Sequence, residues 1–209
     1  SRETLAVPTR DGERVVVAIV PTTAVGRTTV EGLVPELGLS RLHADAVQPI
    51  ATETLERGAW DDALIAGRRA LATELVAAGR VMLRLAREHA LERVQFGRPI
   101  AQFQAVRHRL AETYVALEAA DAALVSAWDA PAPLTAMLAK ALAGRSTTVA
   151  AKHCQQVLAG LGFTSEHALH RYVKRALVLD GLLGSSTRLP QEIGAMLLDT
   201  RRLPRLLEL

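Results

Sequence analysis

The spacing of the hydrophobic residues changes near residue 60. Before that point they stand in short runs or alternate with polar residues, as in Val15–Val20, and glycine or proline interrupts them every few positions. This pattern is typical of short β-strands. From Leu71 and Leu75 onward, apolar residues recur every three or four positions, which is typical of amphipathic helices. The sequence therefore predicts two domains, a partial β segment at 1–58 and a helical segment at 59–209.

The first 50 residues predict four short strands. Thr4–Pro8 and Val15–Val20 form the clearest pair, joined by a turn at Asp11-Gly12. A third strand is expected near Thr28–Val30 and a fourth within Leu42–Pro49. Four short strands make only a partial sheet with open edges, so we expect a preceding segment or another chain to cover them.

Apolar stripes separated by glycine and proline predict five helices after residue 60. Long helices joined by short connections favour an antiparallel bundle. The predicted fold class is therefore mainly α, an antiparallel four-helix bundle preceded by a short partial β domain. The predicted helices run from about residue 61 to the break at Gly97 and Pro99, from that break to Asp129, from 134 to 158, from 166 to 183, and from Pro190 to a point before Pro204.

Composition supports helices and excludes several classes of function. Hydrophobic residues make up 49% of the 209 residues but aromatic ones only 3%, so the core must consist mainly of Ala, Leu and Val, which suits closely packed helices. The net charge is +3 and no run of Lys and Arg alternates with aromatic residues, so nucleic-acid binding is not indicated. No apolar run approaches the roughly 20 residues of a membrane span.

The single cysteine and the histidines offer little chemistry of their own. Cys154 is alone, which excludes an internal disulfide and indicates a reducing compartment, so we expect a cytoplasmic protein. A lone cysteine within a helix usually packs in the core. His153, His167 and His170 lack the spacing and the acidic partners of a metal site, so no metal is expected.

The break between the first two predicted helices carries the most distinctive motif. It reads Arg-x-x-Phe-Gly-x-Pro-Ile from Arg93 to Ile100 and resembles a signature of the acyl-CoA dehydrogenase family, flavoproteins that desaturate acyl thioesters. Segments 156–164 and 166–176 resemble the family's Gln-x-x-Gly-Gly-x-Gly-Phe-Thr turn and its Glu-x-x-x-His-Arg-Tyr-x-Arg-Asp-Ala stretch, although Ala159 replaces one glycine and the aspartate is absent. The three motifs follow the family's order, and the resemblance covers the end of its β domain and its C-terminal helical bundle.

The resemblance implies that the chain contacts FAD. Arg93 would approach the pyrophosphate, Phe96 and Gln104 would flank the adenosine diphosphate portion, and Gln156 and Gly160 would meet the FAD of a neighbouring subunit. A guanidinium pairs well with a diphosphate, and glycine lets backbone N–H groups approach phosphates closely. Plainer interpretations stand beside these, because Arg93 is favourable at any helix C-terminus and Gly160 is an ordinary helix cap.

The same resemblance implies that the usual catalytic base is missing. The family abstracts the α proton with a Glu in a Tyr-Glu-Gly-Thr turn, and Leu183 occupies the Glu position, where an aliphatic side chain cannot accept a proton. Some members carry the base on the first bundle helix, and the matching region near Gly67-Arg68 has no carboxylate either. Asp180 is a weak candidate, because a lone Asp is more often solvated or ion-paired. The catalytic residue is therefore left unknown.

Two functions from different classes are open. The first is a subunit or fragment of an acyl-CoA dehydrogenase-like flavoprotein, which contributes FAD contacts to an assembled enzyme that desaturates an acyl-CoA. The expected partners are the acyl-CoA substrate of the assembled enzyme and other subunits, in a homo- or hetero-oligomer that includes a base-carrying subunit. The second is a non-catalytic helical-bundle assembly protein that has lost the flavin. Because Ser1 opens the chain within the β domain, a truncated piece of a longer enzyme is a third interpretation, and the acyl chain and electron acceptor are left open.

Overall fold

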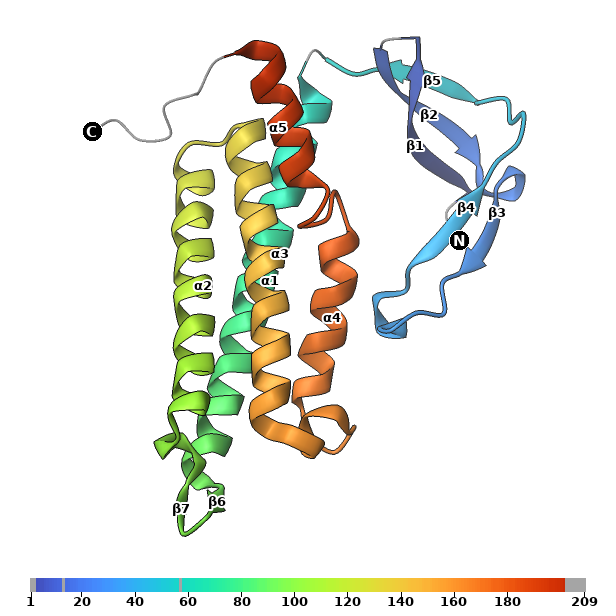
Figure 1. Ribbon diagram of the computed structural model, residues 1–209. Helices are drawn as coiled ribbons and strands as arrows, with labels where there is room; N and C mark the ends of the chain where they lie inside the picture. The colour runs from blue at the N-terminus through green and yellow to red at the C-terminus, as the bar shows by residue number, and fades with distance from the viewer. Residues whose placement is uncertain (1–2, 13, 57, 202–209) are drawn as a thin grey trace. The chain divides into compact units, whose positions relative to one another are not determined.

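The change of hydrophobic period near residue 60 coincides with a division of the structure. The structure, a computed structural model, describes residues 3–12, 14–56 and 58–201. It divides into one unit spanning residues 1–63 and another spanning 64–209. The first contains short antiparallel strands and the second long helices (Figure 1), so the predicted fold class is confirmed.

The first unit holds two small antiparallel sheets. In the larger one, the middle strand buries Val16 and Val20, while the other sheet is a two-stranded hairpin whose residues are mostly exposed. Short 3₁₀ helices at Thr22–Ala24 and Pro35–Leu37 join the strands. The larger sheet has the order β1 (Thr4–Asp11), β2 (Arg14–Pro21), β5 (Ala51–Thr54), and the hairpin pairs β3 (Gly26–Thr29) with β4 (Ser40–His43).

The predicted first two strands are confirmed, but the predicted fourth strand is wrong in position. Residues 42–49 hold only the end of β4, and the last strand of the unit, β5, lies beyond them. All four residues of β5 are exposed, so no alternation of apolar and polar residues marks it in the sequence. β5 forms because its backbone pairs with Val16–Ile19 of β2, a contact that depends on the tertiary structure.

The second unit contains most of the described helical residues. α1, α2, α3 and α4 lie side by side and α5 packs near one end of α3 (Figure 1). Proline opens α3 and lies in the first turn of α5, as the sequence predicts. The helices of the described chain are α1 (Ala59–Glu92), α2 (Gln104–Asp129), α3 (Pro133–Leu158), α4 (Leu169–Gly181) and α5 (Leu189–Thr200).

The fourth helix is shorter than predicted at both ends. A 3₁₀ helix, η4 (Ala159–Phe163), follows α3 directly, and α4 begins at Leu169 and not at residue 166. α4 ends at Gly181 because Leu183 and Gly184 both take a positive φ, of 53° and 104°, which a continuing α-helix does not allow. The turn between α4 and α5 is therefore a defined structure and not an extension of the helix.

Alanine dominates the core of the bundle. Ala72 of α1, Ala120 of α2 and Ala139 of α3 are fully buried in one cluster, and small side chains let the helix axes approach closely. Gly79 packs closely as well, since a Cβ there would overlap with Leu117 of α2 and approach Thr147 of α3. The core thus contains small side chains in place of aromatic ones, and the helices pack closely as a result.

Candidate functional site

The motif from Arg93 to Ile100 forms a tight hairpin between α1 and α2. β6 (Val94–Gln95) pairs with β7 (Arg98–Pro99) across a two-residue turn, in which Phe96 and Gly97 have φ of 52° and 76°. Two successive positive φ values are what a short hairpin turn requires, and they explain the glycine. The predicted break between the first two helices at this motif is confirmed.

The hairpin exposes an aromatic ring. The Phe96 side chain is 91% exposed, and its ring stands edge-on to Phe103 with the ring centroids 6.1 Å apart. The guanidinium of Arg98 lies 4.3 Å from the centroid of the Phe103 ring. An exposed aromatic ring held at a fixed turn is suited to contact with a planar ligand group or another chain.

A hollow of about 510 Å³ lies beside this hairpin and joins segments far apart in the sequence. Its lining includes His89 of α1, Arg93 of the hairpin and Gly160 of η4. The hairpin and η4 lie at the same end of the bundle (Figure 1). A Cβ placed on Gly160 would meet no atom within 4 Å, so its backbone faces open space. This end of the bundle therefore offers a cation and an accessible backbone to one ligand.

Arg93 contributes one positive charge to this hollow. Within the described residues, no carboxylate lies within ion-pair distance of Arg93. Burial lowers the pKa of His89 from its ordinary value, and the nearby His167 and Arg93 lower it further, whereas Glu92 raises it. An unpaired guanidinium in a partly enclosed hollow is suited to hold an anion, and a diphosphate in particular.

A second hollow, of about 360 Å³, adjoins the hairpin. Phe96, Phe103 and Gln156 all line it, so the aromatic ring and the polar side chain face the same space. Gln104, the first residue of α2, is exposed and lines neither hollow. The structure therefore brings four of the five residues selected from the sequence to these two hollows and leaves Gln104 beside them.

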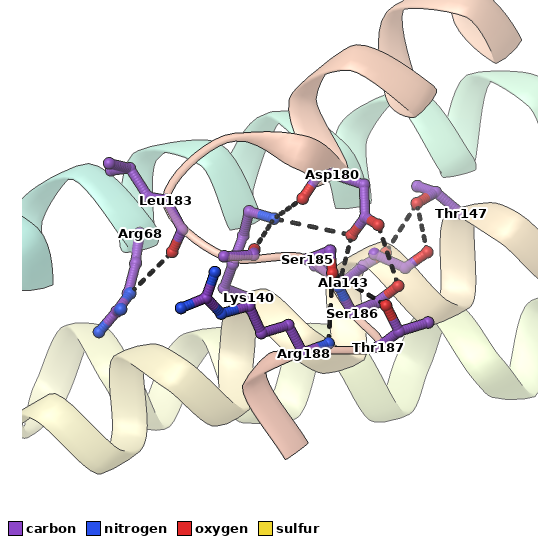
Figure 2. Close-up of polar contacts among 12 residues, drawn as sticks. Arg68, Lys140, Ala143, Thr147, Asp180, Leu183, Ser185, Ser186, Thr187 and Arg188 are labelled. Carbon is purple, nitrogen blue, oxygen red and sulfur yellow. Dashed lines mark hydrogen bonds and ion pairs between the residues drawn. The ribbon is translucent and has the colours of Figure 1, made fainter. Parts of the chain in front are cut away.

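The turn between α4 and α5 is the second place the sequence singled out. Leu183 is 42% exposed, and its carbonyl accepts a hydrogen bond from Nε of Arg68 on α1 at 3.0 Å (Figure 2). Beneath the turn, the fully buried Lys140 of α3 donates from Nζ to the carbonyl oxygens of Asp180 at 3.0 Å and Gly184 at 3.1 Å. Arg68 thus holds the backbone at Leu183 itself, and Lys140 holds it before and after Leu183.

The Asp180 carboxylate is engaged within the same network (Figure 2). Its Oδ1 accepts from the backbone N–H of Ser186 and its Oδ2 from the Ser186 hydroxyl, each at 3.0 Å. Oδ1 also lies 3.7 Å from Nζ of Lys140. A Cβ on Gly144 of α3 would overlap with Oδ1, so the carboxylate approaches the helix backbone where only glycine allows it. These contacts favour a structural role for Asp180.

Sequence reasoning missed Lys140 and the role of Arg68. Lys140 lies in the run Ala-Met-Leu-Ala-Lys-Ala-Leu-Ala, where one charged residue shares a helix face with apolar ones, and this isolation is the signal that could have revealed it. Burial lowers the pKa of Lys140 from 10.5, and the charge and hydrogen bonding of Asp180 counteract that effect. Nothing in the sequence identifies the carbonyl oxygens that Lys140 contacts.

Cys154 packs in the core of the bundle. It is fully buried, and burial raises its thiol pKa from 9.0 to about 12, which makes it a poor nucleophile. Across the described residues, no three His, Cys, Asp or Glu side chains are grouped so that they could bind a metal. Over the same part of the chain, no helix is both long and apolar enough to cross a membrane.

Comparison with known sequences gives a consistent result. A family model described as acyl-CoA dehydrogenase, C-terminal domain, matches residues 59–198. The acyl-CoA dehydrogenase IpdE2 of Mycobacterium tuberculosis is 39% identical over 142 residues, which cover 68% of this chain and 42% of that protein. IpdE2 of Mycolicibacterium smegmatis is 35% identical over 152 residues, or 72% of this chain and 47% of that protein. This chain thus spans less than half the length of these relatives.

Solved structures share the fold. A variant of the Tcur3481-Tcur3483 steroid ACAD matches with a TM-score of 0.84 and 26% identity, over 95% of this chain and 56% of that one. The ChsE4-ChsE5 complex from Mycobacterium tuberculosis gives a TM-score of 0.81 and 24% identity, over 97% of this chain and 57% of that one. At the latter identity the likeness shows the fold alone.

Proposed function

The chain belongs to the acyl-CoA dehydrogenase family, and from this premise we propose that it is the C-terminal part of a flavoprotein subunit that contributes FAD contacts to an assembled enzyme. The reaction of that assembly is α,β-desaturation of an acyl-CoA thioester. In the proposal, another chain supplies the carboxylate that removes the α proton, because no carboxylate stands at Leu183 or in the region of Gly67 and Arg68.

One observation carries the proposal: Arg93 and Gly160, 67 positions apart by their numbers, line one hollow. Both were selected from separate sequence motifs, and a protein that kept only the fold has no physical need for them to meet. The guanidinium has no carboxylate partner among the described residues, and the glycine leaves its backbone open, so both fit the pyrophosphate of one FAD. This placement departs from the resemblance, which implied that Gly160 meets the FAD of a neighbouring subunit.

The other selected residues suit the remainder of an adenosine diphosphate group. Phe96 offers an exposed ring for the adenine, and Gln156 shares the second hollow with it. Gln104 would join them from the start of α2 when a neighbouring chain closes the site. When bound, FAD supplies the acceptor for the hydride that leaves the β carbon of the thioester.

In this function the chain itself transfers no proton. An aliphatic side chain at Leu183 cannot act as a base, and the Asp180 carboxylate is occupied by Ser186 and Lys140. A base-carrying partner therefore completes the site. The Tcur3481-Tcur3483 steroid ACAD, which shares the fold, is named for two components, and this supports a heteromeric assembly.

A second candidate function is favoured by the bracing of the α4–α5 turn. The backbone carbonyl oxygens of that turn accept hydrogen bonds from Arg68 and Lys140 within the same chain. A purely structural bundle requires such internal contacts. Such a protein would serve in assembly and would bind no flavin. Retention of an unpaired Arg93 beside Gly160 argues against it.

Flavin binding separates the two functions. The visible absorption spectrum is recorded for the purified full protein, alone and after co-expression with the product of the neighbouring gene. A flavin band in the complex supports the proposal, and Arg93→Gln is expected to weaken FAD affinity by about tenfold or more, the size of a lost charged hydrogen bond. Arg107→Gln, an exposed α2 residue outside both hollows, is the matched control. If neither preparation binds added FAD, the assembly function is correct and the enzymatic one is wrong.

A further inference from the structure

His89 occupies a place in the first hollow that no sequence motif selected. It lies one helical turn before Arg93 on the last turn of α1, and both side chains line the hollow of about 510 Å³ with Gly160. Arg93 directly follows α1, and its backbone N–H donates to the His89 carbonyl at 2.9 Å. Both residues line the same hollow, so the imidazole and the guanidinium can reach one anion together.

The imidazole is available for a ligand. Within the described parts of the chain, neither ring nitrogen of His89 takes part in a hydrogen bond or an ion pair. His167 and His170 differ in this respect, since Nδ1 of His167 accepts from the backbone N–H of Leu169 and Nδ1 of His170 contacts the His167 carbonyl. Of these three histidines, His89 is the one with both nitrogens free and a place in the hollow.

We propose that His89 is a second cationic contact for the diphosphate of an adenine nucleotide, and that the nucleotide binds with uptake of a proton by His89. This inference rests on the proposed nucleotide binding at this end of the bundle. Imidazolium and guanidinium side by side would neutralise the two negative charges of a diphosphate, which Arg93 alone cannot do.

The electrostatic surroundings give the direction of the effect. Burial, His167 and Arg93 all lower the pKa of His89, and Glu92 opposes them, so the free protein holds His89 neutral at neutral pH. A bound diphosphate reverses this balance, since an adjacent anion favours the charged imidazole. His89 therefore charges when the anion arrives, and binding strengthens as pH falls. Because His167 is an imidazole that also acts on His89, the experiment includes a His167 variant as a control.

The test measures FAD affinity of the flavin-free assembled protein by calorimetry at about pH 5.5 and about pH 7.5, in two buffers of different ionisation enthalpy. We expect affinity to rise by about fivefold at the lower pH, which corresponds to a pKa increase somewhat below one unit, with proton uptake on binding. In His89→Gln both the pH dependence and the proton uptake should disappear.

Three further variants make the result specific. His89→Arg carries its charge at every pH and should bind FAD tightly with no pH dependence, which keeps the inference testable if His89→Gln folds poorly. His108→Gln, an exposed α2 residue outside the hollow, should behave as wild type. A pH dependence that survives in His89→Gln and disappears in His167→Gln overturns the inference.

Two ligands carry the same chemistry, so coenzyme A is titrated in parallel. If the protein takes up a proton when FAD binds but not when coenzyme A binds, His89 contacts the flavin nucleotide. If it takes up a proton with coenzyme A but not with FAD, His89 contacts the thioester carrier. If FAD binds but the protein takes up no proton with FAD or with coenzyme A, the role of His89 is overturned and the proposed function stands. If neither ligand binds, both conclusions are overturned.

Discussion

A Cβ atom placed on Gly67 would lie 2.5 Å from Cδ1 of Leu183, so the Leu183 side chain rests directly against the α1 backbone. These residues lie at the two places where the family resemblance allows a catalytic Glu, one on the first bundle helix and one in the turn after α4. Their contact brings the two segments to one point in space. Under the proposed function, glycine and leucine leave that point without a proton acceptor.

Replacing Leu183 by Ala tests this conclusion. We expect turnover of the assembled enzyme to stay within about threefold of wild type, because an alkyl group takes no part in proton transfer. Steady-state kinetics with a saturating acyl-CoA measure it. Asp180→Asn is assayed beside it, and a loss of about 10²-fold or more with unchanged stability would make Asp180 the base and contradict the proposal.

The two glycines of α1 should respond differently to Ala. At Gly67 the new methyl group meets only the end of a half-exposed Leu183 side chain, which can turn away, so we expect a change in unfolding free energy below about 1 kcal/mol. At Gly79 it meets the buried Leu117 and Thr147, so Gly79→Ala should destabilise by about 1–3 kcal/mol. Urea unfolding measures both, and equal effects would contradict the close packing at Gly79.

Lys140→Met should destabilise the protein by about 2–3 kcal/mol. The change leaves two carbonyl oxygens without their donor and removes the cation beside Asp180, while preserving most of the side-chain volume. Lys152→Met, at an exposed position of the same helix, is the control and should change stability by less than about 0.5 kcal/mol. A neutral result for Lys140→Met would show that burying the charge costs as much as its contacts contribute.

Alkaline pH should act in opposite directions on two buried groups. The pKa of the Cys154 thiol rises from 9.0 to about 12 on burial, so above about pH 9 the unfolded chain loses this proton first and stability falls, by about 1.4 kcal/mol per pH unit. The pKa of Lys140 is lowered from 10.5, so between that lowered value and 10.5 the unfolded chain binds more protons and stability rises with pH. Comparing the pH slopes of Cys154→Ala and Lys140→Met with wild type separates the two, and a Cys154→Ala slope equal to that of wild type would contradict the first.

Ala159→Gly should stabilise the protein. Ala159 has φ of 52° and ψ of −133°, a conformation that side chains disfavour by about 1–3 kcal/mol, and it stands where the family motif has glycine. Relief of this strain is partly offset by the greater freedom of glycine in the unfolded chain, so we expect a net gain of about 1 kcal/mol in thermal or urea unfolding. Gly160→Ala makes the reverse substitution at the neighbouring position and is measured for comparison. A loss of stability in Ala159→Gly would contradict the conclusion that the backbone at Ala159 is strained.

The helices and most of their ends could be read from the sequence because local physics determines them, although α4 is shorter than predicted. A period of 3.6 in the apolar residues fixed the buried face of each helix, and proline or glycine fixed most of its limits. The hairpin after α1 was equally readable, since Gly97 and Pro99 cannot continue a helix. β5 could not be read, because its exposed residues owe their conformation to pairing with β2.

The candidate site shows the same division. The sequence by itself determined which residue types are present: a cation at Arg93, glycine at Gly160, and no carboxylate at Leu183. Only the tertiary structure decided that Arg93, Gly160 and His89 share one hollow, and that Leu183 rests on Gly67. The physical reason is that a motif describes backbone and side-chain preferences within a few residues, whereas a binding site depends on contacts between segments that only helix packing brings together.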